Sequence, residues 1–260
     1  FGDLTVSPEA NRTATDFIRA KIRDIVPDKD LAERLCPTDY YAKRPLCTDG
    51  YYEAFNRNDV TLVDLKETPL LEITERGIRT TAGEIELDVI ILATGFDAFT
   101  GNYLKIETVG RDGERLQDKW ADGPRAFMGV ATAGFPNLFM VFGPFSPFTS
   151  QPMVDEFQVD WIARLIGEAL TTGTSAVEVD RGAEDAWIAT CNDIAEQTLF
   201  AVTDSWINGA NVPGKPRRTM IYMGGMAAYA RFIEDVAARG YEEFRFVVPE
   251  GVERLSERQA

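Results

Sequence analysis

The chain has 260 residues, of which 45% are apolar, so it is long enough to bury the core of one large domain or two smaller ones. Its net charge of -15 argues against a nucleic-acid partner, because a phosphate backbone repels such a surface. No run of apolar residues approaches the roughly 18 that a membrane helix requires, so we expect no membrane partner either.

Histidine is absent, and the three cysteines, Cys36, Cys47 and Cys191, are widely spaced. An odd number of cysteines without a CxxC pair indicates free thiols in a reducing cytoplasm, where we place the protein. Without histidine, this chain alone cannot build a Ser-His-Asp triad, a Cys-His dyad or a histidine-ligated metal site. We therefore expect no metal, and any catalytic cation must be Arg or Lys.

The first elements are helical. Ser7 and Pro8 form a good helix start, with a capping hydroxyl followed by proline at the first helical position. Apolar residues then recur at helical spacing at Ala10, Ala14, Phe17, Ile18, Ile22 and Ile25. Asp30 and Glu33 have the spacing of a capping box and predict a short second helix. Residues 37–50 are predicted to be irregular.

From Val60 the apolar period becomes strand-like. Short strands are predicted at 60–65, 70–73 and 77–81, with turns at 75–77 and 82–83. Residues 84–87 then lead into the run 88–93, which is apolar on both faces, as expected for a central parallel strand. The segment that follows lies at a carboxyl strand end, where open α/β sheets place their ligands. A second buried strand is predicted at 138–142.

Three helices are predicted after a loop at 145–152, because apolar residues repeat along one face of each. These faces are formed by Phe157, Trp161 and Leu165, then by Trp187, Cys191, Ile194 and Thr198, and then by Tyr229, Phe232, Ile233 and Val236. Gly240 is predicted to end the third helix. Residues 205–215 are predicted to be a loop, and the polar tail after Pro249 is expected to fray.

Five blocks of the sequence resemble the class B flavoprotein monooxygenases of the Baeyer–Villiger type, and within them the cyclohexanone monooxygenase group. The blocks are Leu35–Cys47, Gly50–Arg57, Ala93–Ala98, Gly134–Phe139 and Trp206–Lys215. The Ala-Thr-Gly-Phe-Asp motif alone would be a weak signal, but five blocks in the family's order and spacing are a strong one. The similarity extends over residues 1–244.

The resemblance implies an α/β fold, as part of a flavoprotein with two Rossmann-like dinucleotide-binding domains, for FAD and NADPH, and with C-terminal helices. Residues 1–48 would be the end of the NADPH-binding domain and 49–150 the C-terminal part of the FAD-binding domain. Residues 151–260 would be a helical part that packs on the FAD domain. The chain has no GxGxxG motif, and Phe1 is not a translation start. We therefore expect it to be the C-terminal half of a complete enzyme, whose N-terminal half is on the same or a separate chain.

The implied activity is the insertion of one oxygen atom from O2 beside a ketone carbonyl, which gives an ester or lactone. Such a reaction needs a flavin peroxide that stays deprotonated. A guanidinium is permanently charged, so it stabilises an anion without delivering a proton. The match to the family places this catalytic arginine at Arg44. The resemblance also places Lys43 near the phosphate that distinguishes NADPH from NADH, a role suited to a compact charge.

The resemblance assigns further residues to the site. Those implied at the cofactors are Thr94, Gly95, Phe96, Asp97 and Trp206, where glycine permits close backbone approach and the tryptophan would cover the cavity as a lid closes. Those implied at the ketone are Phe145, Phe148, Thr149 and Gln151. Phe145 and Gln151 depart from the smaller and aliphatic residues that we expect from the family, and this departure leaves the substrate range open.

Two other functions stay open at this point. A related flavin monooxygenase would act on nitrogen or sulfur, but that chemistry can use the protonated hydroperoxide, so the block around Arg44 argues against it. A non-catalytic half, truncated or split, would serve as a folding or dimerisation partner, and the missing glycine motifs keep this reading open. Each site residue also has a plainer reading, such as a surface ion pair for Arg44 and a core anchor for Trp206.

Overall fold

The computed structural model describes residues 2–44 and 46–248, which form two compact units. The first unit ends at Gly95 and the second begins at Phe96. The tail after Pro249, which was predicted to fray, lies outside the described residues. No helix in the described part of the chain is both long enough and apolar enough to cross a membrane.

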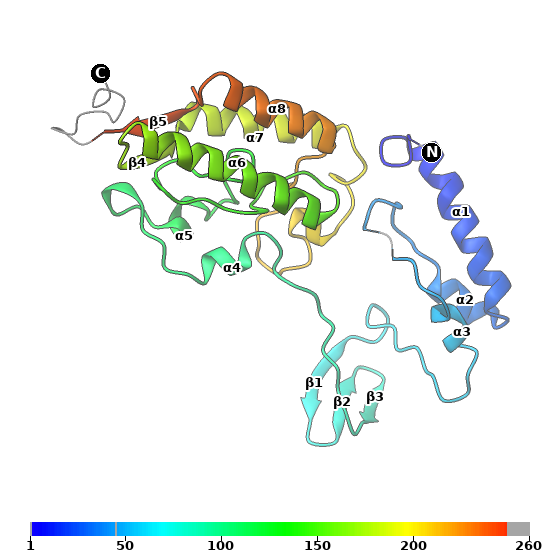
Figure 1. Cartoon of the computed structure of the whole chain (residues 1–260). Coiled ribbons are helices and arrows are strands. Elements are labelled where there is room, and N and C mark those ends of the chain that lie inside the picture. The colour runs from blue at the N-terminus through cyan, green and yellow to red at the C-terminus, as the bar shows by residue number, and fades with distance from the viewer. Residues whose placement is uncertain (1, 45, 249–260) are drawn as a thin grey trace, which may run out of the picture. The chain divides into compact units, whose positions relative to one another are not determined.

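The first unit begins with three helices, α1 (Pro8–Ile25), α2 (Lys29–Leu35) and α3 (Tyr51–Ala54) (Figure 1). The predicted cap of α1 is confirmed, because Ser7 Oγ accepts a hydrogen bond of 3.2 Å from the backbone N–H of Ala10. Ile22 of α1 is buried against α2, but Phe17 is 63% exposed, contrary to the prediction. The buried stripe of α1 is narrower than expected because its core is a small cluster shared with α2 and its flanking residues.

The second helix begins earlier than predicted. Asp28 is the cap of α2, since its carboxylate accepts a hydrogen bond of 3.1 Å from the N–H of Leu31. The predicted capping box of Asp30 and Glu33 is therefore wrong. Glu33 instead pairs with Arg23 of α1, with the Arg23 Nε and Glu33 Oε1 atoms 2.6 Å apart.

A small antiparallel sheet completes the first unit, in the order β1 (Leu70–Thr74), β2 (Gly77–Thr80) and β3 (Gly83–Glu86). The predicted strands at 70–73 and 77–81 are thus confirmed. Those at 60–65 and 88–93 are wrong, because neither segment is a strand in this chain. In the second of these, Ile91 is 86% exposed. A strand needs a neighbour for its backbone hydrogen bonds, and no described strand pairs with this run.

The second unit contains the predicted helices, which Figure 1 shows as α6, α7 and α8 lying side by side. All three predictions are confirmed, although Thr198 follows the end of the second helix and Gln151 belongs to the first helix, not to the preceding loop. The elements of this unit are α4 (Gly101–Leu104), η1 (Arg111–Gly113), α5 (Leu116–Lys119), α6 (Gln151–Thr171), β4 (Ala176–Val179), α7 (Arg181–Glu196), η2 (Trp206–Asn208), α8 (Met226–Ala238) and β5 (Phe244–Val247). As predicted, Gly240 follows α8 in the left-handed conformation, with φ 77°.

Two features of this unit differ from the sequence-based expectation. The antiparallel pair β4–β5 was not predicted. Each strand has only four residues, which is too short for its alternation of apolar and polar residues to indicate a strand. The strand predicted at 138–142 is absent. That segment is irregular, with an isolated bridge from Phe139 to Ala131 and a bend at 141–142.

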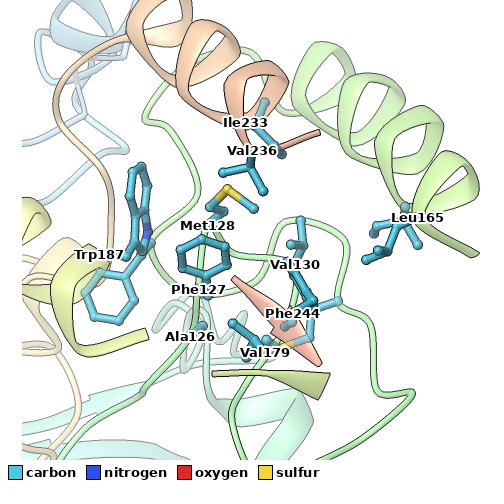
Figure 2. Close-up of a cluster of buried hydrophobic side chains, with 14 of the residues drawn as sticks. Ala126, Phe127, Met128, Val130, Leu165, Val179, Trp187, Ile233, Val236 and Phe244 are labelled. Atoms are coloured by element: carbon cyan, nitrogen blue, oxygen red, sulfur yellow. The ribbon is translucent and has the colours of Figure 1, made fainter. Parts of the chain in front are cut away.

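The core of the second unit lies between the three long helices, the β4–β5 pair and the turns at residues 126–130 (Figure 2). Trp187 of α7 has its ring 4.7 Å from that of Phe232 and 5.0 Å from that of Tyr222, measured between centroids. On α6, the Trp161 indole donates a hydrogen bond of 2.7 Å to the carbonyl of Ile233 on α8. The predicted apolar faces therefore pack against one another.

A buried cluster of charged and polar groups connects residues 119–133 to α7. Glu184 is fully buried, and its carboxylate lies 3.1 Å from Lys119 Nζ and 3.3 Å from Arg125 Nε. It also accepts hydrogen bonds of 2.9 Å from Thr132 Oγ1 and from the N–H of Ala133. Burial lowers the pKa of the Lys119 ammonium, and the Glu184 carboxylate opposes that shift.

Replacing Glu184 by Gln is expected to destabilise the second unit by about 3–5 kcal/mol, because it leaves the buried Lys119 ammonium without a counter-charge. Asp185→Asn provides the control, since Asp185 pairs with Arg125 at the exposed surface and such pairs contribute at most about 1 kcal/mol. Urea unfolding measures both. Equal stability of the two variants would show that Glu184 is not a structural counter-charge.

Candidate functional site

In the first unit, a buried amide side chain fixes the segment that carries Lys43 and Arg44. Asn11 of α1 is fully buried, and its Nδ2 donates hydrogen bonds to the carbonyls of Leu4 (2.8 Å) and Tyr41 (3.1 Å). Its Oδ1 accepts one of 2.9 Å from the N–H of Tyr41. Because the N–H and the carbonyl of Tyr41 both bond to the Asn11 side chain, the backbone two residues before the exposed Lys43 is held in place.

These two cations line a groove of about 760 Å³ in the first unit. Arg34 of α2 lines it as well, together with residues 62–67. Within the groove, Lys43 Nζ lies 2.5 Å from an Asp39 carboxylate oxygen, and Arg34 Nε lies 3.5 Å from Glu67. Four cations line the groove, Arg34, Lys43, Arg44 and Lys66, together with the four carboxylates of Glu33, Asp39, Asp64 and Glu67. The cations are the groups of this groove that can bind an anionic ligand.

The predicted cofactor residues 94–97 lie where the two units join along the chain. Thr94 and Gly95 end the first unit, are exposed, and have no regular structure. Phe96 and Asp97 begin the second. Asp97, which the resemblance implies at the cofactors, has a carboxylate oxygen 2.5 Å from Lys215 Nζ.

Three contacts join residues 96–98 to the 205–215 segment, the first of which is the ion pair of Asp97 with Lys215. Lys215 Nζ also donates a hydrogen bond of 3.0 Å to the Ala98 carbonyl, and Asn211 Nδ2 donates one of 3.0 Å to the Phe96 carbonyl. The segment has more internal structure than the predicted loop. Ser205 and Asn208 form a capping box around η2, and Asn208 Nδ2 donates a hydrogen bond of 3.0 Å to the Thr203 carbonyl.

Five rings from four segments meet beside these contacts. The ring of Trp206 is stacked on that of Phe99 at 5.8 Å, which in turn stacks on Phe142 at 6.2 Å. The ring of Phe148 lies 6.4 Å from Trp206 and 5.6 Å from Phe200. We call Phe99, Phe142, Phe148, Phe200 and Trp206 the aromatic assembly. The structure therefore brings together two predicted site residues, Trp206 and Phe148, that are far apart in sequence.

The other residues predicted at the ketone lie in different environments. Phe145 is buried, Thr149 is half-buried, and Gln151 is exposed in the first turn of α6. The segment from Phe145 to Phe148 is held by two backbone hydrogen bonds. The Phe145 N–H donates to the Met220 carbonyl (2.8 Å), and the Phe148 N–H donates to the Tyr222 carbonyl (3.0 Å). A side chain at Gly129 would lie 2.0 Å from Ser146 Oγ, so only glycine fits there.

Sequence reasoning missed the residue that makes the most side-chain hydrogen bonds to this turn. Gln158 of α6 is fully buried and bonds to Phe142, Ser146, Met128 and Tyr229. The signal was present, since position 158 lies on the buried face of α6 together with Val154, Trp161, Ile162, Leu165 and Ala169. A polar residue in an apolar stripe requires hydrogen-bond partners in the core. Asn11 gives the same signal on α1.

Comparison with known proteins adds to this geometry. No family model matches the chain. The chain is 50% identical over 245 residues to a phenazine N-monooxygenase of Lysobacter antibioticus, covering 94% of this chain and 45% of that protein. It is 48% identical over 242 residues to a Baeyer–Villiger monooxygenase of Pseudooceanicola batsensis, covering 93% and 44%. Its fold matches the crystal structure of cyclohexanone monooxygenase from Rhodococcus sp. Phi1 bound to NADP+ with a TM-score of 0.93 and 46% identity, covering 96% of this chain and 47% of that one.

The chain matches the C-terminal half of a Baeyer–Villiger monooxygenase. It spans about half the length of the curated relatives it matches. This confirms the resemblance and the mixed α/β fold with C-terminal helices. The site residues of this Baeyer–Villiger half stay predictions. No group of three or more acidic or cysteine residues that could hold a metal ion occurs in the described segments.

Breaking the ion pair between Lys215 and Asp97 should release the 205–215 segment. Lys215→Met is expected to increase hydrogen exchange of the amides at 205–215, because a half-buried pair and the bond to the Ala98 carbonyl are both lost. Lys105→Met, at an exposed lysine of the same unit, is the control. Unchanged exchange at 205–215 in the Lys215 variant would show that the ion pair does not hold the segment.

Proposed function

We propose that this chain provides the C-terminal half of an FAD- and NADPH-dependent Baeyer–Villiger monooxygenase. The reaction inserts one oxygen atom from O2 beside a ketone carbonyl and gives an ester or lactone. The observation that carries the proposal is Arg44, a permanent cation that lines the groove of the first unit, on a segment that the buried Asn11 fixes from α1. The relatives of the Baeyer–Villiger type support the reaction class.

The cations of the groove are the groups that would hold an anionic dinucleotide. Bound FAD, reduced by NADPH, would supply the electrons and the activation of O2, and the protein supplies the environment. Lys43 and Arg34 would hold phosphate, because both line the groove and their present partners are exposed carboxylates that an anion can displace. Arg44 would stabilise the negative charge that develops on oxygen as the ketone reacts, and it would not deliver a proton because a guanidinium is permanently charged.

In the second unit, the aromatic assembly would exclude water and contact the ketone. Trp206 and Phe148 supply apolar surface, and the residues proposed with them at the substrate are Phe145, Thr149 and Gln151. Thr94, Gly95, Phe96 and Asp97 would support the flavin. The proposal includes the domain assignment, with 1–48 as the end of the NADPH-binding domain, 49–150 as part of the FAD-binding domain and 151–260 as the helical part. It also includes a cytoplasmic location and an N-terminal half that binds FAD.

A related oxygenation at nitrogen is the alternative that the comparison raises, because one relative at 50% identity is a phenazine N-monooxygenase. The two reactions differ in what they require of the arginine. Oxygen transfer to nitrogen can proceed from a protonated oxygen donor, whereas attack on a ketone carbonyl needs an anion. A variant that lacks Arg44 therefore separates them.

Arg44→Ala in the complete enzyme is expected to retain FAD and to lower ester formation from a cyclic ketone by at least about 10²–10³-fold, the typical effect of removing one charge-stabilising donor. Arg44→Lys should rescue poorly, because an ammonium lacks the planar fork of a guanidinium. Arg57→Ala, at an exposed arginine paired with Asp59, serves as the control. Product yield is measured by gas chromatography. Ester formation at the wild-type level in Arg44→Ala would refute this role.

The chain expressed alone should purify without yellow colour, because it has no GxGxxG motif to hold the FAD pyrophosphate. Co-expression with the N-terminal half of a relative should restore the flavin absorbance near about 450 nm. Absorbance spectra of the two preparations measure the bound flavin. A yellow preparation of the 260-residue chain alone would contradict the proposed division of the cofactor site.

A further inference from the structure

The carboxamide of Gln158 bonds to the turn at 142–146 at two places. Gln158 Oε1 accepts a hydrogen bond of 2.7 Å from the N–H of Phe142, and Nε2 donates one of 3.0 Å to Ser146 Oγ. Both Gln158 and Ser146 are buried. One side chain thus spans the turn that precedes the proposed ketone-contacting residue Phe148.

The rest of the Gln158 environment orients the carboxamide. Nε2 also donates to the hydroxyl of Tyr229 (2.7 Å) and to the Met128 carbonyl (3.2 Å). The Tyr229 hydroxyl donates in turn to the same Met128 carbonyl, at 2.7 Å. Burial raises the pKa of the Tyr229 hydroxyl, so it remains a donor. These partners place the oxygen of the amide toward Phe142, because the nitrogen is the atom that satisfies the acceptors.

The turn needs such support because its backbone is strained. Phe142 has φ 53° and Phe145 has φ 68°, both in the left-handed region that side chains other than glycine seldom adopt. Residues persist in such conformations only where the surrounding structure holds them. The Gln158 bonds act at Phe142 itself and at the residue after Phe145.

The position of this turn determines the position of the aromatic assembly. The Phe142 ring stacks on Phe99, and Phe99 stacks on Trp206. From the other end of the turn, Phe148 contacts Trp206 and Phe200. Movement of the turn would therefore displace rings that come from three other segments.

We propose that Gln158 is a positioning residue that sets ketone preference by fixing the turn at 142–146 and, through it, Phe148 and the aromatic assembly. This rests on the proposed function for the role of Phe148, whereas the structural part can be tested without it. The role requires an acceptor and donors on one buried side chain. Leu offers neither, and Glu keeps the acceptor but, when ionised, has no donor for Ser146 or Tyr229.

The test compares Gln158→Leu, Gln158→Glu and Tyr229→Phe in the complete enzyme. Tyr229→Phe is the matched control, because it removes two hydrogen bonds of the same buried network without removing the bonds to Phe142 and Ser146. Two readouts are taken. The first is the ratio of kcat/KM for a small and a large cyclic ketone, and the second is hydrogen exchange of the amides at 142–146.

We expect Gln158→Leu to change the ketone ratio by about 10-fold or more, since a misplacement of about 1 Å can cost on the order of 10²-fold. Exchange at 142–146 should accelerate in the same variant. Tyr229→Phe should change the ratio and the exchange less than Gln158→Leu does, because the bonds of Gln158 to Phe142 and Ser146 remain. Gln158→Glu should fall between them, and it carries the test if Gln158→Leu does not fold.

A wild-type ketone ratio in both Gln158 variants would overturn the specificity role, and wild-type exchange at 142–146 would overturn the positioning role. An equal change of the ratio in Tyr229→Phe would also overturn the proposal, because it would assign the effect to general loss of stability. Failure of the wild-type enzyme to form any ester would overturn the proposed function instead, and the exchange measurement would then decide the positioning role on its own.

Discussion

In the second unit, the Gln158 carboxamide lies where the turns at 128–130 and 142–146 meet the helices α6 and α8. Leaving one buried hydrogen-bonding group without a partner costs about 1–3 kcal/mol, so this arrangement is favourable only when all of its partners are in place. That requirement selects one conformation of the 142–146 turn among the many that apolar packing would accept. The stacked rings of Phe142, Phe99 and Trp206 follow from that conformation.

In the first unit, a buried amide side chain likewise holds an irregular segment. Asn11 is a fully buried amide on α1, and it satisfies its hydrogen bonds with backbone groups of Leu4 and Tyr41. Each unit thus has a buried amide on a long helix that holds an irregular segment, and each segment leads to a proposed functional residue. Both segments are irregular. This is expected of segments that carry functional side chains, because binding and catalytic residues occur disproportionately on loops that a rigid scaffold positions.

The sequence predicted the long helices well, because α1, α6, α7 and α8 repeat apolar residues over several turns. It failed at 88–93, where the apolar pattern is that of a strand buried on both faces but no strand within residues 2–44 and 46–248 pairs with it. It also failed at 138–142, which is irregular chain. Short apolar runs carry no information about whether a hydrogen-bonding neighbour is present.

For the candidate site, Arg44 and Trp206 were found through blocks that resemble a family, and Phe148 through the place of its loop in that resemblance. No periodicity or composition would have selected them. Gln158 and Asn11 had a physical signal in the sequence, as polar residues within buried stripes. Their partners could not be named in advance, because the bonded residues lie up to 71 positions away and the fold alone brings them together.

The most direct measurement of the central claim is the fate of molecular oxygen in the complete enzyme. The enzyme would be supplied with isotopically heavy O2, NADPH and an equal mixture of a cyclic ketone and a phenazine, and the products would be analysed by mass spectrometry. The account predicts a lactone that carries one heavy oxygen atom in its ring. A heavy N-oxide with no lactone, or a lactone without the label, would contradict it.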